Sequence, residues 1–98
     1  MKATYYKVDG LEAEVSPADG KHFTYKELQI FVGKMVEIVP FGEGKVIVIH
    51  EEGKLIGLLP NRNAIEQWKI TYPIEKYPHN NDELIVGDAL ITDEGYIE

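Results

Sequence analysis

The pattern of hydrophobic and polar positions changes period several times along the 98-residue chain. Between Met35 and Asn61, β-branched residues occur in short blocks bounded by glycine and proline, and the block Val46–Ile49 is the longest. Such residues pack well on a pleated sheet and lose side-chain freedom in a helix, so these blocks predict strands. Four consecutive apolar residues further predict a strand that is shielded on both faces.

We therefore predict an antiparallel meander of two or three short strands in this central part. Its arms are residues 36–39, 46–49 and 55–59, with glycine-containing turns at 41–45 and 51–54. In the second turn Gly53 is expected to take a positive φ. In the third arm Gly57 is expected to form a bulge or a barrel corner.

A hairpin is predicted over residues 2–15, ahead of the meander. Asp9-Gly10 separates two strand-like segments and favours a two-residue type I′ turn, in which both positions need positive φ. The second arm alternates apolar and acidic residues, which predicts one wet face. The two sets are Leu11, Ala13 and Val15 on one side and Glu12 and Glu14 on the other.

The main helix is predicted at about 24–32. Thr24 and Glu27 have the spacing of a capping box, Phe23 and Leu28 can form a hydrophobic staple, and Gly33 occupies the position after the C-terminus. Its apolar stripe is expected to consist of Tyr25, Leu28, Phe31 and Val32.

A second, short helix is predicted at about 63–69. Asn61 and Asn63 are both plausible N-caps, and Glu66 completes a capping pair with Asn63. Residues 71–81 contain two prolines and two tyrosines and are expected to form a loop of the kind that is often functional. Residues 84–92 predict a last strand, interrupted by a kink at Gly87-Asp88.

These elements predict a single α+β domain over residues 1–98. Its sheet is expected to be a bent antiparallel sheet or a small open β-barrel, with the helix at 24–32 packed across it and the second helix at 63–69. A chain of this length can bury one hydrophobic core without covalent staples.

Charge narrows the range of functions. The net charge is −7, and no Lys or Arg follows Lys76, whereas six acidic residues do. Binding to a nucleic-acid backbone requires clustered cations, so direct nucleic-acid binding is disfavoured. The acidic surface fits a soluble, solvated face, a basic protein partner, or mimicry of DNA. The six residues are Asp82, Glu83, Asp88, Asp93, Glu94 and Glu98.

The sequence also lacks several kinds of chemistry. There is no Cys, so disulfides and zinc-thiolate sites are excluded. No apolar run approaches the length of a membrane span, and the N-terminus has no signal-like segment, so we expect a cytoplasmic protein without membrane contact. The glycines match no phosphate-binding motif, and Ser16 is the only serine. We expect no cofactor and no enzymatic activity.

Three clusters remain as candidate sites. His50-Glu51-Glu52 combines imidazole with carboxylates, but strand neighbours point to opposite faces, so we expect no metal there. Asn61, Arg62 and Asn63 stand at a predicted helix start, where a carboxylate or phosphate could bind, although capping alone accounts for both asparagines. Trp68, Tyr72 and Tyr77 predict either an interaction surface or a cover for the end of the barrel.

Five segments of the chain together carry a family resemblance: 28–33, 36–39, His50-Glu51-Glu52-Gly53-Lys54-Leu55, Leu58-Leu59-Pro60-Asn61 and Ile85-Val86-Gly87-Asp88-Ala89-Leu90. In these segments the chain resembles a family of small domains of unknown function that occur widely in bacteriophages, plasmids and other mobile elements. The resemblance implies a phage or mobile-element accessory protein and implies no activity or catalytic residue. The family usually carries Asn at the position of His50.

We therefore expect a non-enzymatic binding module that binds a host or phage protein and modulates host processes. The alternative is a protein that binds or sequesters a small anionic or nucleotide-like molecule through Arg62 and the helix start. A third hypothesis is an acidic DNA mimic. Exposed strand edges could also pair between two copies of the chain in a homodimer.

Overall fold

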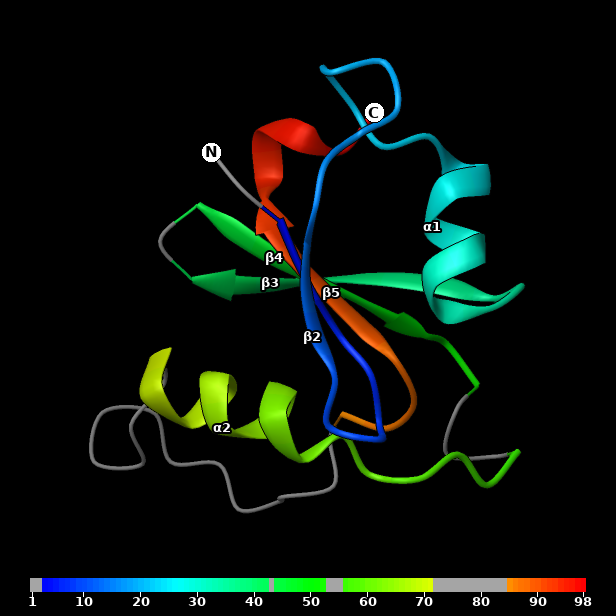
Figure 1. Cartoon of the computed structure of the whole chain (residues 1–98), viewed down its shortest axis with the longest axis vertical. Coiled ribbons are helices and arrows are strands. Elements are labelled where there is room, and N and C mark those ends of the chain that lie inside the picture. Colours follow the sequence, from blue (N-terminus) through cyan, green and yellow to red (C-terminus); the bar gives the residue numbers. More distant parts are fainter. Residues whose placement is uncertain (1–2, 43, 53–55, 72–84) are drawn as a thin grey trace.

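The computed structural model describes residues 3–42, 44–52, 56–71 and 85–98 (Figure 1). Five strands form one antiparallel sheet in the order β2-β1-β5-β4-β3. In Figure 1, β3 and β4 cross the direction of β1, β2 and β5 steeply, so the sheet is strongly bent but open. The strands are β1 (Ala3–Tyr6), β2 (Glu12–Val15), β3 (Val36–Gly42), β4 (Lys45–His50) and β5 (Ala89–Asp93).

The central strand of the sheet is β5, which comes from the end of the chain. It pairs with β1 on one side, where Tyr5 lies opposite Leu90, and with β4 on the other, where Ile47 lies opposite Ile91. The predicted kink is confirmed, because Gly87 has φ 77° and the strand proper starts at Ala89. A 3-10 helix, Glu94–Tyr96, follows directly.

The first two arms of the predicted meander are confirmed as β3 and β4, but the third arm is wrong. Ile56 and Gly57 lie in a turn, and Pro60 makes only an isolated bridge to Val86. Leu58 and Leu59 have no regular secondary structure, and Gly53 and Leu55 lie outside the described residues. The physical reason is that β4 pairs with β3 along one edge and with β5 along the other. No edge of β4 is therefore left for residues 55–59 to pair with.

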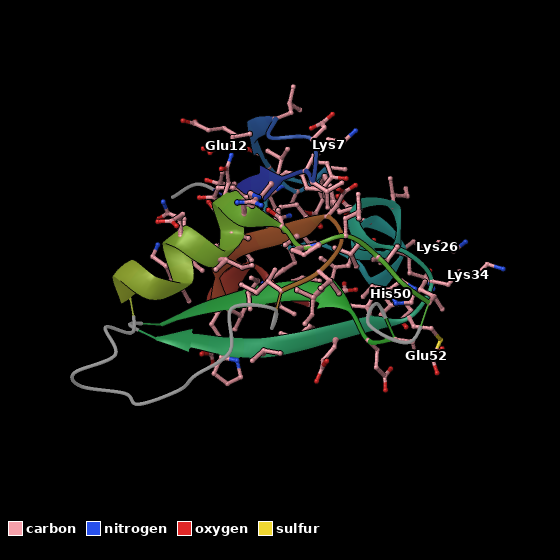
Figure 2. All side chains as sticks on the ribbon, turned by 90° about the horizontal axis from the view of Figure 1, so that it is seen from below. Lys7, Glu12, Lys26, Lys34, His50 and Glu52 are labelled. Atoms are coloured by element: carbon pink, nitrogen blue, oxygen red, sulfur yellow. The ribbon has the colours of Figure 1, made fainter. Side chains whose placement is uncertain are left out.

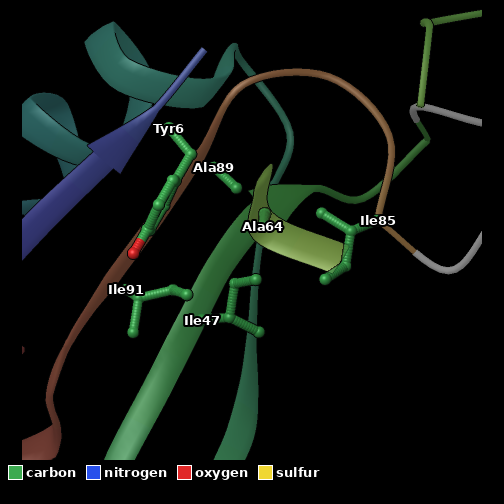
Figure 3. Close-up of a cluster of buried hydrophobic side chains, with 6 residues drawn as sticks. All are labelled: Tyr6, Ile47, Ala64, Ile85, Ala89 and Ile91. Carbon is green, nitrogen blue, oxygen red and sulfur yellow. The ribbon is translucent and has the colours of Figure 1, made fainter. Parts of the chain in front are cut away.

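Strand β4 is shielded on both faces, as predicted. Val46, Ile47 and Val48 are buried, and Ile49 is half-buried. Ile47 and Val48 belong to different hydrophobic clusters, because successive strand side chains point to opposite faces. One cluster is Tyr6, Ile47, Ala64, Ile85, Ala89 and Ile91 (Figure 3). The other is Ala3, Phe23, Leu28, Val32, Val48 and Leu90.

Helix α1 (Tyr25–Val32) covers the face of the sheet that carries Val48, and its start matches the prediction. The Thr24 hydroxyl accepts from the Glu27 N–H at 3.2 Å, and the Glu27 carboxylate accepts from the Thr24 N–H at 3.0 Å. The predicted stripe needs one correction, because Tyr25 is 54% exposed. An eight-residue helix has a narrow buried face, which Leu28 and Val32 fill.

Helix α2 (Arg62–Thr71) covers the opposite face, where Ala64 is buried among the first cluster. It begins one residue before the predicted start, and Asn61 is its N-cap: the Asn61 Oδ1 atom accepts from the Ala64 N–H at 3.1 Å. Asn63, the other candidate cap, lies within the helix and donates to the carbonyl of Gly10 at 3.1 Å.

The N-terminal hairpin forms with a different turn from the one predicted. Gly10 N–H donates to the Lys7 carbonyl, and Lys7 N–H donates to the Leu11 carbonyl, so the loop contains three residues, Val8 to Gly10. A three-residue loop needs positive φ at its last position alone, and Gly10 supplies it with φ 96°. Glu12 and Glu14 are exposed as predicted, whereas Leu11 is exposed too.

A groove between the hairpin, helix α1 and the turn before β5

A groove of about 480 Å³ is present in the described part of the chain. Four segments far apart in the sequence form it: the β1 hairpin, the C-terminal half of α1, residues 57–59 and the Gly87-Asp88 turn. The lining is mainly apolar and contains one ionisable carboxylate, that of Asp88. Ligand sites commonly combine such an apolar lining with a few polar groups.

Asp88 is held in place by two donors from the hairpin. Its Oδ1 atom accepts from the Val8 N–H at 3.0 Å, and its Oδ2 atom accepts from the Tyr5 hydroxyl at 3.1 Å. The same hydroxyl lies 2.8 Å from the Phe31 carbonyl oxygen. A phenol has a single proton, so these two acceptors share one donor and neither is fully satisfied by it.

The environment of Tyr5 raises the pKa of its hydroxyl to about 12. Burial is the largest cause, because it penalises the charged phenolate, and the hydrogen bond and negative charge of Asp88 add to it. The Tyr5 ring also packs edge-on against Phe31, with centroids 4.8 Å apart. Tyr5 is therefore a fixed, neutral donor at neutral pH.

Backbone contacts hold the turn that presents Asp88. Gly87 N–H donates to the Leu59 carbonyl at 2.7 Å. The Gly87 carbonyl accepts from the side-chain amide of Asn61 at 2.8 Å, and the same amide donates to the Tyr6 carbonyl at 2.8 Å. The start of α2, strand β1 and the turn before β5 are thus fastened together behind the groove.

The rim of the groove is apolar and open to solvent. Ile30 on α1 is 81% exposed, Leu59 is 68% exposed and Val8 is also exposed. Single exposed apolar side chains are ordinary on a protein surface, whereas several around one hollow indicate a contact site. The lysines of this region do not line the groove, and Figure 2 shows Lys26 and Lys34 extending away from the body.

The three residues predicted at the helix start occupy different environments. Asn61 is fully buried, and both its amide group and its Oδ1 atom bind other parts of the chain. Arg62 is exposed, and Asn63 is half-buried against the hairpin loop. The hypothesis of an anion site here stays a prediction, and of the three residues Arg62 is the most exposed.

The predicted aromatic surface lies outside the described residues, since these include neither Tyr72 nor Tyr77 nor the side chain of Trp68. His50 can be described. Its Nδ1 atom accepts from the Glu52 N–H at 3.0 Å. Within residues 3–42, 44–52, 56–71 and 85–98, no group of three His, Asp or Glu side chains is placed to hold a metal ion.

Sequence reasoning did not find Tyr5, Ile30 or Asp88 as site residues. The sequence predicts a kink at Gly87-Asp88, but nothing local to the turn indicates that Tyr5 lies next to it in the fold. The sequence did contain one signal for Asp88. An acidic residue between two apolar runs needs a hydrogen-bond donor or contact with solvent, which marks it as a residue with a specific environment.

The fold and groove define a small α+β domain with a bent antiparallel sheet, one helix on each face and an open, mainly apolar groove. The chain belongs to the family described as Domain of unknown function (DUF3846), which matches residues 1–97. No curated protein and no solved structure shows a significant match. Neither helix in the described ranges has the length and apolar character needed to cross a bilayer.

Proposed function

We propose that this chain is a non-enzymatic interaction module that binds a partner protein through the groove beside Asp88. The observation that carries the proposal is the position of Val8, Ile30 and Leu59, three exposed apolar side chains that line the same hollow. Burying them against a partner removes apolar surface from water, which drives most protein association. The rigid Tyr5–Asp88 pair beneath them adds a polar group that fixes orientation.

The proposal extends to the setting of the protein. We take it to be an accessory protein of a phage or mobile element that acts in the host cytoplasm on a host or phage protein. The support is the sequence resemblance and the acidic composition, with a net charge of −7. Binding of a small anionic molecule at Arg62 and mimicry of DNA by the acidic residues remain predictions of lower rank.

Pairing of two copies through a sheet edge has weaker support. The edge strand β3 contains Pro40, which has no N–H to donate, and the edge strand β2 is short and carries Glu12 and Glu14. Proline and charge on edge strands are the usual means by which proteins avoid edge-to-edge pairing. The groove is therefore the better candidate surface.

The proposal can be tested by site-specific crosslinking. A photo-reactive benzoyl-phenylalanine at position 30 should capture a partner protein in host cells, whereas the same group at position 38 should not. Ile38 is a suitable control because its side chain is also exposed and lies on edge strand β3, outside the groove.

The captured partner is then purified and its affinity measured. Ile30→Ser and Leu59→Ser are each expected to weaken binding about tenfold, the loss typical of removing a well-placed interface side chain. Ile38→Thr should leave the affinity unchanged. Equal binding by wild type, Ile30→Ser and Leu59→Ser would reject the groove as the binding surface.

A further inference from the structure

We infer that the groove recognises a partner segment in which an arginine or lysine is flanked by apolar residues, with the cation bound by Asp88. This inference rests on the proposed function and names the chemistry of the partner. Within the described residues Asp88 lines the groove without an ion-pair partner. A carboxylate in a mostly apolar hollow attracts a cation that arrives with the ligand, because opposite charges interact more strongly where water is partly excluded.

The hydrogen bonds of Asp88 leave room for that cation. A carboxylate has about four acceptor positions. Val8 N–H occupies one, and the Tyr5 hydroxyl divides its proton between Asp88 and the nearer Phe31 carbonyl. The Oδ2 atom therefore has unused acceptor capacity, and a guanidinium can donate two parallel hydrogen bonds to a carboxylate.

The surroundings select for apolar residues beside the cation. Ile30 and Leu59 project into solvent at the rim, and Val8 is exposed next to the N–H that holds Asp88. The aliphatic stem of an arginine or lysine can lie along such side chains while its charged end reaches the carboxylate. The net charge of −7 favours the approach of a basic segment over an acidic one.

The carboxylate is also held rigidly, which lowers the cost of binding. Asp88 follows a glycine whose N–H and carbonyl are both bonded, to Leu59 and to Asn61 respectively. Its own two oxygens are oriented by strand β1 and the hairpin loop. A group already fixed in its binding position loses little freedom on complex formation.

Two matched synthetic peptides test this recognition. The first is acetyl-Ser-Leu-Arg-Leu-Ser-amide, in which leucines flank the arginine, and the second replaces arginine with citrulline, which has nearly the same shape and no charge. Titrations followed by amide NMR shifts should show that the arginine peptide binds about tenfold more tightly, as expected for gaining a charge-assisted hydrogen bond. The amides of Val8, Ile30, Gly87 and Asp88 should shift most.

Asp88→Asn is expected to abolish the preference for arginine over citrulline while retaining weak apolar binding. Glu52→Gln is the matched control, because Glu52 is an exposed carboxylate outside the groove lining, and it should retain the preference. The comparison of the two peptides on the wild-type protein needs no substitution, so it holds even if Asp88→Asn folds poorly.

Equal affinity for both peptides, shifts located away from the groove, or no binding by either peptide would each overturn the inference. None of these results would reject the proposed function, which depends on the crosslinked partner and the Ile30 and Leu59 variants. Conversely, a partner that binds elsewhere would reject the proposed function even if the arginine peptide preferred the groove.

Discussion

The hydroxyl of Tyr5 lies 3.1 Å from the Oδ2 atom of Asp88, which joins two residues 83 positions apart in the sequence. The contact fastens the first strand of the sheet to the turn that leads into the last one. It also places an ionisable phenol and a carboxylate within one hydrogen bond of each other in the lining of the groove.

This pair predicts a loss of stability at alkaline pH. A tyrosine in the unfolded chain ionises near pH 10, whereas folding raises the pKa of Tyr5 to about 12. The raised pKa of Tyr5 therefore contributes fully to the stability of the folded state below pH 10, and this contribution is lost as the pH rises toward 12. Urea unfolding from pH 8 to 12 should show a shallower decline for Tyr5→Phe than for wild type.

The slope should not vanish in Tyr5→Phe, because burial also raises the pKa of Tyr6. Asp88→Asn provides the matched variant, since it removes the charge and keeps the shape of the side chain. It should lower the pKa of Tyr5 only in part, because burial is the largest cause of the shift. Parallel pH profiles for Tyr5→Phe and wild type would contradict the assignment.

The buried amide of Asn61 predicts a large effect of a small substitution. Asn61→Ala leaves the carbonyls of Tyr6 and Gly87 and the N–H of Ala64 without their partner. Losing several buried hydrogen bonds should lower the free energy of unfolding by about 3 kcal/mol or more. Asn63→Ala removes one less buried bond and should cost about 0.5 kcal/mol. Urea denaturation measures both.

Asn61→Asp should be still less stable than Asn61→Ala at pH 7, because a carboxylate has no proton to donate to the two carbonyls. Burial raises the pKa of the introduced carboxyl group, so protonation favours the folded state. The stability of Asn61→Asp should consequently rise relative to Asn61→Ala as the pH falls. A pH-independent difference between the two variants would show that the amide does not donate to both carbonyls.

The contact between Gly33 and His50 predicts a second sensitive position. Gly33 has φ 118°, and a Cβ atom there would lie 2.5 Å from the Cδ2 atom of His50. Gly33→Ala should cost about 3 kcal/mol from backbone strain and overlap together. Gly20→Ala is the control, with φ 78° and open space around the added carbon, and should cost about 1 kcal/mol.

A double-variant cycle separates the two contributions at Gly33. His50→Ala should recover about 1 kcal/mol of the loss in Gly33→Ala by removing the overlap, while the backbone strain remains. Additive effects of the two substitutions would mean that the imidazole moves aside freely.

The capping box predicts pH dependence of the opposite sign. Hydrogen bonds from the Thr24 N–H and then the Ala18 N–H lower the pKa of Glu27 below its usual 4.5. The Glu27 carboxylate thus contributes fully to the stability of the folded state above its pKa in the unfolded chain. This contribution is lost as the pH falls through the lower pKa of the folded state. Unfolding midpoints of wild type and Glu27→Gln should converge in acid, and a constant gap down to pH 2 would contradict this.

The hydroxyl half of the same box can be tested at neutral pH. Thr24→Ala should lower the free energy of unfolding by about 1 kcal/mol, whereas Thr24→Ser keeps the cap and should change it little. Equal losses in both variants would indicate that the methyl group of Thr24, rather than its hydroxyl, stabilises the helix start.

Local signals predicted the elements of this fold well where the determining contacts are local. The Thr24–Glu27 spacing specified the start of α1, and the β-branched block at 46–49 specified a strand buried on both faces. The Gly87-Asp88 kink was also visible, because glycine and aspartate interrupt an apolar run. In each case the residues that decide the structure are within a few positions of one another.

Long-range pairing explains what local signals missed. Residues 55–59 have the apolar content of a strand, but β5 takes the place beside β4. Likewise, Asp9-Gly10 predicted a two-residue turn, whereas the register between Tyr6 and Glu12 leaves a three-residue loop. The groove was not predicted because its four segments meet only after β1 and β5 have paired.

The central place of β5 has a consequence for biosynthesis. Ribosomes make β5 after the other four strands, so the hairpin of β1 and β2 and the hairpin of β3 and β4 emerge with no strand to join them. Each nascent hairpin must keep an unpaired edge open until residues 89–93 insert between them. This protein is therefore expected to acquire its sheet in one late step, and a ribosome stalled before that segment should present an aggregation-prone chain.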